Sequence, residues 1–235
     1  MDGLVQAMDA GLTYLFYKGA VANTAAGQYH SYWRSAGNPV APAVPSTALV
    51  YPTSTYAGTF SQGIPTSTSQ FYIGQFTMNG TVIGSMVLQD RLAYMGGLSG
   101  TSTAANTIGR TSSGPVIDDA RCSSYYDADW FMETYVDLGG TASSLYVYFT
   151  ATDGSTGLAK VVIPATCRAS RMIPIVSTLS TQTIKSVDTV TLQATTGSTG
   201  GYGITCARSI CIIGNMVANV NFTNDFATIG MPKIG

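Results

Sequence analysis

Residues 71–88, which read FYIGQFTMNGTVIGSMVL, give the clearest indication of the fold. Two runs rich in β-branched and aromatic residues flank the dipeptide Asn79-Gly80, a strong signal for a tight hairpin turn. The pattern predicts one strand over 71–78 and a return strand over 81–88. We therefore expect a protein built mainly from antiparallel β-strands.

Short apolar or alternating runs continue along the rest of the chain, separated by Gly, Ser, Asn and Asp. A turn is expected at Asp153-Gly154, and an interruption at Gly214. Seven to nine strands without a convincing central helix are typical of an antiparallel sandwich. The stretch 96–129 lacks apolar periodicity, so we expect a long loop excursion there. The further strands are predicted at 130–137, 144–150, 158–163, 171–176, 183–194 and 202–220.

The N-terminal part of the chain has a different texture. Apolar residues recur every three to four positions between Asp2 and Lys18, which predicts an amphipathic helix ended by Gly19. Prolines and small residues then predict an extended arm or a series of loops. We therefore divide the chain into a helix and arm over 1–46 and a β-sandwich domain over 47–235.

Candidate contact residues lie in this N-terminal part. The apolar stripe of the predicted helix needs a packing partner, which is either a neighbouring subunit or the body of the same chain. Residues 28–34 place several aromatic rings beside one positive charge, which suits an anchor that docks in a groove. The residues that we expect to form an assembly interface are Leu4, Met8, Leu12, Leu15, Tyr32 and Trp33.

Charged residues make up only 10% of the chain, against roughly 25% in an ordinary soluble domain. Such a composition suits a surface rich in hydroxyl groups or one that is buried in an assembly. The 11 basic and 12 acidic residues are scattered, which argues against direct binding of nucleic acid or an anionic membrane. We find no apolar run approaching 18 residues and no secretory signal, and we expect synthesis and folding in a cytosol.

The cysteines and the single histidine do not predict a metal or cofactor site. The four cysteines stand without the close pairs of a zinc site, and His30 is distant from them. We expect free thiols, because the chain shows no secretory signal. Cys206 and Cys211 lie five residues apart in an extended segment, so their side chains point to opposite faces and cannot easily bond each other.

A group of acidic residues could in principle supply a general acid and base or bind calcium, the latter being the better functional interpretation. Turn caps and solvated loop charges explain the group more simply, because it lacks the pattern of an EF-hand loop. The group comprises Asp118, Asp119, Asp127, Asp129, Glu133 and Asp137.

Other catalytic motifs are missing from the sequence. We find no Gly-x-Ser-x-Gly elbow, and the glycine cluster at 197–203 lacks the Lys-Ser/Thr ending of a phosphate-binding loop and predicts a flexible hairpin. We therefore predict no catalytic residue and do not expect an enzyme.

Three stretches resemble strands of tailed-bacteriophage virion proteins: GSMVLQDRLAYMGGLS at 84–99, RMIPI at 171–175 and IKSVDTVTL at 184–192. The likeness covers roughly 70–221, and that group includes capsid decoration or cement proteins and head-associated proteins with a jelly-roll sandwich. The resemblance implies a jelly-roll-like fold and a place on the capsid exterior after assembly in the host cytoplasm. It implies a homo-oligomer that bridges major capsid protein subunits and needs no cofactor.

Two other functions stay open at this point. A carbohydrate- or receptor-binding module of a head fibre or tail would use a shallow aromatic cleft, formed by Tyr125, Tyr126 and Trp130. A polysaccharide hydrolase would use the acidic region near 118–133, and this is the weakest of the three hypotheses.

Overall fold

The computed structural model describes residues 15–21, 24–53, 56–59, 71–108, 122, 125–230 and 233–234. The chain forms two compact units. The sandwich unit comprises Tyr17–Thr59 and Arg91–Arg208, and the ribbon unit comprises Met1–Phe16, Phe60–Asp90 and Ser209–Gly235. This grouping differs from the division that we expected at residue 46, because residues 17–59 pack with the sandwich strands.

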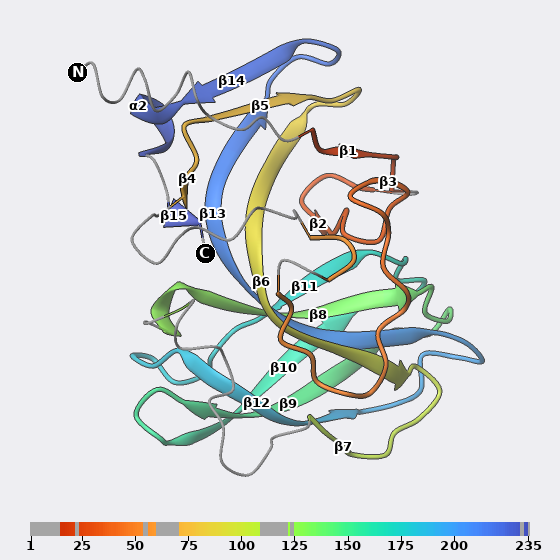
Figure 1. Cartoon of the computed structure of the whole chain (residues 1–235). Helices are drawn as coiled ribbons and strands as arrows, with labels where there is room; N and C mark the ends of the chain where they lie inside the picture. The colour runs from red at the N-terminus through yellow and green to blue at the C-terminus, as the bar shows by residue number, and fades with distance from the viewer. Residues whose placement is uncertain are drawn as a thin grey trace. The chain divides into compact units, whose positions relative to one another are not determined.

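The sandwich unit contains two antiparallel sheets, which Figure 1 shows stacked face to face. The five-stranded sheet has the order β2-β11-β8-β13-β6, with the bounds Tyr29–His30, Arg171–Ile175, Ala128–Val136, Gly201–Asn215 and Gly84–Ser99. The four-stranded sheet has the order β10-β9-β12-β7, with the bounds Thr156–Ile163, Ser143–Ala151, Ile184–Leu192 and Asn106–Thr107.

One hydrophobic core lies between these two sheets. Side chains alternate across each strand, so Val147 and Phe149 of β9 point inward and are fully buried. Trp130 of β8 joins them and is only 2% exposed. Its indole Nε1 donates a hydrogen bond to the Ile184 carbonyl of the facing sheet at 3.1 Å, so the one polar atom of this large side chain is satisfied.

The structure confirms the expected mainly-β, antiparallel architecture. Strands β8 to β13 follow the predicted runs within a few residues, because each run alternates and is bounded by turn residues. The Asp153-Gly154 turn is confirmed as well. The Gly154 N–H donates to the Ala151 carbonyl at 3.0 Å, and Gly154 has a φ of 87°, which favours glycine.

The ribbon unit overturns the hairpin expected at Asn79-Gly80. Strand β5 (Gln75–Asn79) does not pair with the segment that follows it but with β14 (Asn221–Asp225), so that Asn79 faces Asn221. The Gly80 carbonyl accepts a hydrogen bond from the Asn219 N–H at 2.8 Å. A long-range partner has therefore displaced the local hairpin. The unit also contains β4 (Phe71–Tyr72), β15 (Lys233–Ile234) and the short helix α2 (Phe226–Ile229).

The helix predicted as far as Lys18 does not extend that far, and residues 2–14 lie outside the described residues. Tyr17–Lys18 form strand β1, which pairs with β3 (Gly37–Asn38). The Lys18 ammonium donates hydrogen bonds to the carbonyls of Trp33 and Ser35 at 3.2 Å each, and to that of Pro39. These hydrogen bonds hold the backbone around Lys18 in an extended conformation. The apolar spacing of the sequence gave no indication of them.

The predicted loop excursion at 96–129 is partly strand. Strand β6 continues to Ser99 with Leu98 buried, β7 lies at the edge of the four-stranded sheet, and a 3-10 turn at Tyr125–Asp127 leads into β8. The segment 109–121 lies outside the described residues. The expectation fails at the ends of the segment because backbone hydrogen bonds to a neighbouring strand can form at polar residues too, as at Asn106-Thr107, which pair with β12.

Gly203 of β13 lies where no side chain fits. A Cβ atom at this position would lie 1.9 Å from the Met95 carbonyl oxygen and 2.7 Å from the Tyr135 ring. Gly203→Ala should therefore lower the free energy of unfolding by about 3 kcal/mol. Gly140→Ala is the matched control, because an added Cβ there meets nothing within 4 Å. Denaturant titration of both variants measures the difference, and equal stabilities would contradict the close approach.

Candidate functional site

The arm of the sandwich unit covers the outer face of the five-stranded sheet of its own chain. The Ser31 N–H donates to the Ser170 carbonyl at 2.7 Å, and Val50 forms a two-way backbone bridge with Tyr94. Further along β6, the Gly96 N–H donates to the Ser46 carbonyl at 2.7 Å. Residues 29–51 are thus bound to the sheet at several points along its length.

A buried ion pair lies beneath this arm. Arg91 of β6 donates from Nη1 to Glu133 of β8 at 2.6 Å, and the Glu133 side chain is almost completely buried. Thr205 of β13 donates to the same carboxylate at 2.6 Å, and Tyr135 donates to it at 3.2 Å. From the arm, Ser31 accepts from Arg91 Nη2 at 3.3 Å. The carboxylate therefore has several donors, as a buried charge requires.

Aromatic rings enclose the guanidinium of this pair. The Trp33 ring lies 4.0 Å from the Arg91 guanidinium carbon, measured to the ring centroid. The same ring packs edge-on against Tyr94, with 4.7 Å between the ring centroids. Trp33 was expected to be an assembly contact, and the structure places it in a cation–π contact within its own chain.

The ionisation of Glu133 follows from two opposing effects. Burial by itself would favour the neutral acid, but the charge and hydrogen bonds of Arg91, together with the Thr205 hydroxyl, hold the pKa of Glu133 below its ordinary value. Burial, and then the Glu133 carboxylate, raise the pKa of Tyr135 well above the ordinary value. The site is an ion pair with a neutral phenol at neutral pH, and its groups are occupied with one another.

The other expected interface residues lie in different surroundings. Leu15 is 74% exposed, and Tyr32 is half-buried at the turn that follows β2. Leu4, Met8 and Leu12 fall outside the described residues. The interface prediction stays a prediction for all six residues, and Trp33, which is half-buried, also contacts Arg91 within the chain.

The four described members of the predicted acidic group do not come together as one site. Asp127 and Asp129 are exposed, Glu133 is buried, and Asp137 pairs with Arg168 at 2.7 Å. Asp118 and Asp119 fall outside the described residues. Within the part of the chain that the structure describes, no three His, Cys, Asp or Glu side chains lie together as a metal site.

The three aromatic residues of the carbohydrate-binding hypothesis are also separated by burial. Tyr126 is 66% exposed and Tyr125 is half-buried with the Lys185 ammonium 5.5 Å from its ring centroid. Trp130 belongs to the core, as described above. A ligand cleft would therefore have to form without the indole ring.

The cysteines and the glycine cluster also have defined places. Cys122, Cys167 and Cys206 are buried and Cys211 is half-buried. The glycine cluster at 197–203 joins β12 to β13, which belong to different sheets, so it is a crossing between layers rather than the predicted hairpin.

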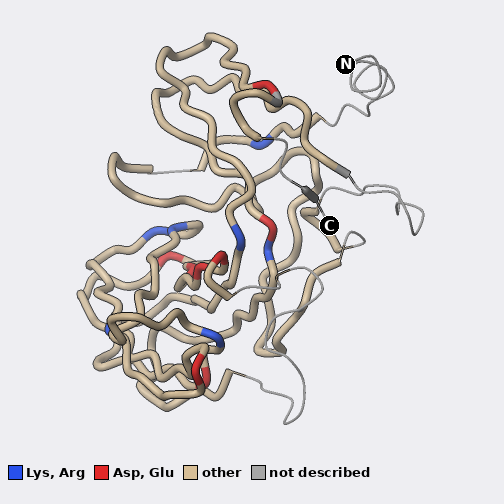
Figure 2. The backbone as a smooth tube through the Cα atoms, turned by 90° about the vertical axis from the view of Figure 1, so that its left-hand side faces the viewer, with Lys and Arg blue, Asp and Glu red and all other residues tan. Residues whose placement is uncertain are grey.

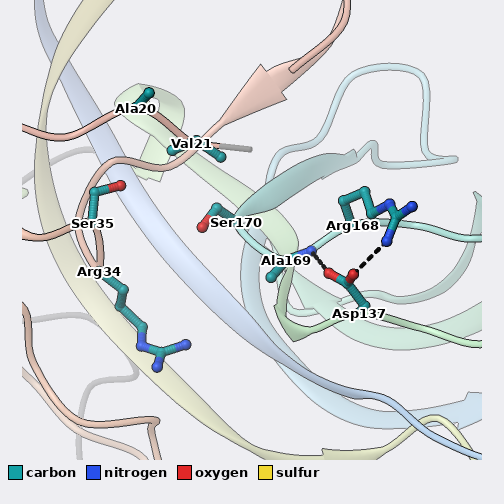
Figure 3. Close-up of a pocket in the computed structure, with 8 residues that line it drawn as sticks. All are labelled: Ala20, Val21, Arg34, Ser35, Asp137, Arg168, Ala169 and Ser170. Carbon is teal, nitrogen blue, oxygen red and sulfur yellow. Dashed lines mark hydrogen bonds and ion pairs between the residues drawn. The ribbon is translucent and has the colours of Figure 1, made fainter. Parts of the chain in front are cut away.

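A small cavity of about 200 Å³ lies beside the arm in the sandwich unit. Figure 3 shows the Asp137–Arg168 pair on one side and Arg34 extending away from it on the other. The Ala169 N–H, at 2.7 Å, and the Arg168 guanidinium hold the pKa of Asp137 below its ordinary value. Arg34 donates to the Tyr135 carbonyl at 3.1 Å. The lining residues are Ala20, Val21, Arg34, Ser35, Asp137, Arg168, Ala169 and Ser170, and these include no pair of carboxylates for acid–base chemistry.

The sheet opposite the arm carries an apolar outer surface that sequence reasoning missed. On β9 and β10, the outward side chains include Tyr148 (48% exposed), Leu158 (42%) and Val162 (67%), and Leu158 faces Tyr148 in the register. We define the β9–β10 face as Tyr146, Tyr148, Leu158, Lys160 and Val162. The sequence did carry a signal for this surface. These two strands have apolar residues at both inward and outward positions, whereas a strand with one solvated face alternates between apolar and polar residues.

Figure 2 marks the positions of Lys, Arg, Asp and Glu along the described backbone, and these positions are few. Among the described residues, no helix has both the length and the apolar character for a membrane span. Comparison with family models, curated proteins and solved structures finds nothing that matches this chain.

Removal of the buried carboxylate should strongly destabilise the protein. Glu133→Gln keeps the side-chain volume but leaves the Arg91 guanidinium buried without its counter-ion, so we expect the free energy of unfolding to fall by about 3–5 kcal/mol. The double variant Arg91→Met with Glu133→Leu should recover most of this loss, because no charge is then buried. Denaturant titration compares the variants, and a double variant less stable than Glu133→Gln would refute this explanation.

Acid should weaken the edge of the sheet at His30. Burial, and then the charge of Arg171, lower the pKa of His30 below 6.5, and both ring nitrogens are buried without a partner among the described residues. The unfolded chain thus binds the proton more readily, so stability is fully present above about pH 6.5 and declines as the pH falls towards the folded pKa. His30→Gln should remove this component below about pH 6.5 in pH-dependent melting, and an unchanged slope would contradict it.

Proposed function

We propose that this protein is a non-enzymatic structural protein of a tailed-bacteriophage particle, a decoration or cement protein on the exterior of the head. Its partner is the major capsid protein, and it acts as a homo-oligomer that stabilises the shell. The proposal extends the sequence resemblance with two features of the fold, namely the strand order of the sandwich unit and the apolar β9–β10 face.

The strand order supports a jelly roll. Of the eight strands β6 to β13, the first lies beside the last, the second beside the seventh, the third beside the sixth and the fourth beside the fifth. Successive pairs alternate between the five-stranded and the four-stranded sheet. A long antiparallel ribbon folded over on itself produces this order, which viral capsid proteins, lectins and cupins share. The order by itself does not select among these functions.

The observation that carries the proposal is the β9–β10 face. Contiguous exposed apolar side chains mark interaction sites more often than scattered ones do, and this face holds Lys160 as its single charged residue. The same strands also carry the outward pair Thr150 and Thr156, and Thr150 donates to Asp188 of β12 at 2.7 Å. Lys160 lies 5.9 Å from the Tyr146 ring centroid. A face with this composition matches the charge-depleted core of a protein interface. The rigid sandwich behind it holds the face in one shape, which suits repeated attachment to identical capsid subunits.

The attachment device is therefore not the whole arm that the sequence indicated. Residues 29–51 are bound to the sheet of their own chain at several points. The proposal therefore assigns attachment chiefly to the β9–β10 face, while the interface residues expected from the sequence stay predictions.

The test is co-sedimentation of the purified protein with phage heads that lack it. We expect saturable binding, and we expect Val162→Asp to weaken it at least about tenfold, because a carboxylate must then be desolvated in the interface. Val176→Asp is the matched control, because Val176 is 72% exposed but lies outside the β9–β10 face. No binding by the wild type, or equal losses in both variants, would refute the proposal.

A further inference from the structure

Five exposed apolar side chains gather at one end of the ribbon unit. Two belong to the turn that joins β5 to β6, and three to the turn that joins β13 to β14. We call this cluster the apolar tip. Its members and exposed fractions are Val82 (64%), Ile83 (70%), Met216 (70%), Val217 (53%) and Val220 (45%).

The two turns are joined by hydrogen bonds, so the tip is one surface. Asn215, whose side chain is buried, donates from Nδ2 to the carbonyls of Gly80, at 3.1 Å, and Val82. The Asn219 N–H donates to the Gly80 carbonyl at 2.8 Å. Both turns also lie side by side in Figure 1. A surface held in place in the free protein loses little conformational entropy when it binds.

The composition of the tip is unusual for turns. Exposed turns ordinarily carry Gly, Asn, Asp, Pro and Ser. Here the glycines and asparagines shape the backbone, while the outermost positions hold aliphatic side chains. By contrast, the exposed face of the β5–β14 ribbon behind the tip is polar, with Thr77 bonded to Thr223 and Asn79 bonded to Asn221. The tip therefore differs from the exposed face of the β5–β14 ribbon, although Ile212 of β13 is also 60% exposed.

No charged residue occurs in either segment that carries the tip, over 71–89 or over 209–224. The absence of charge limits which kind of partner can bind to the tip. An interface between two copies related by a twofold axis sets the same patch against itself, so a charge close to the axis meets its own copy. A patch without charges has no such like-charge contact, so it can pack against its own copy.

We propose that the apolar tip is a self-association surface that docks against the tip of a second copy of this chain. The inference rests on the homo-oligomer of the proposed function and names its contact surface, which belongs to a different unit from the β9–β10 face. A lipid bilayer is the less favoured occupant, because the tip holds no Lys or Arg for anionic headgroups and no aromatic ring for the interfacial zone.

Sedimentation velocity of the full chain tests the proposal over about 1–300 μM, a range suited to a contact of modest area. The mass of the wild type should rise above 24.5 kDa with concentration. Ile83→Asp should weaken self-association at least about tenfold, and so should Ile83→Lys. An equimolar mixture of the two variants should associate more strongly than either variant alone, because opposite charges then meet across the contact.

The matched control is Val162→Asp, which should leave self-association unchanged while it weakens attachment to phage heads. Ile83→Asp should do the reverse, so failure of this inference and failure of the proposed function can be told apart. Far-ultraviolet circular dichroism checks that the variants are folded. A wild type that stays monomeric over the whole range, or a mixture no stronger than its components, would overturn the proposal. Flotation of a monomeric wild type with neutral phosphatidylcholine vesicles would also overturn it and would assign the tip to lipid.

Discussion

The ion pair between Arg91 and Glu133 ties the arm to the sandwich. A carboxylate this deeply buried is tolerated only when its counter-ion and further donors complete its coordination. The pair itself belongs to β6 and β8, but Ser31 bonds to its guanidinium and Trp33 covers it. The ion pair and the position of the arm therefore depend on each other. If the arm moved, Arg91 would lose its contacts with Ser31 and Trp33.

This constraint decides which surfaces remain for assembly. Residues 29–51 are bound to their own sheet at several points, so the proposed attachment relies on other parts of the chain. The described residues offer two apolar surfaces of this kind, the β9–β10 face in the sandwich unit and the apolar tip in the ribbon unit. Both are almost free of charge, which follows from a composition with only 11 basic and 12 acidic residues in 235. Desolvation of charged groups therefore opposes association at these surfaces very little.

The strands β8 to β12 could be predicted from the sequence because their signals are local. Alternation of side chains and the turn at Asp153-Gly154 act over a few residues, and no distant partner overrides them. The buried ion pair could not be predicted, because its two residues are 42 positions apart and Glu133 belongs to an acidic stretch that resembles a solvated loop. The β9–β10 face left a trace, since Tyr146 and Tyr148 make β9 apolar on both sides, but that pattern also fits a strand buried on both faces.

By itself, the sequence determined that the chain folds mainly into antiparallel strands, that its charges are few, and where most strands begin and end, because these properties depend on composition and on neighbours in the chain. The tertiary structure decided how the strands are partnered. Asn79-Gly80 has the residues of a hairpin turn, yet β5 pairs with β14, because the Gly80 carbonyl bonds to Asn219 and the Asn215 amide. Tertiary structure also decided that Trp33 is enclosed while Ile83 is exposed. Burial depends on which distant segments meet, and no local pattern of residues records it.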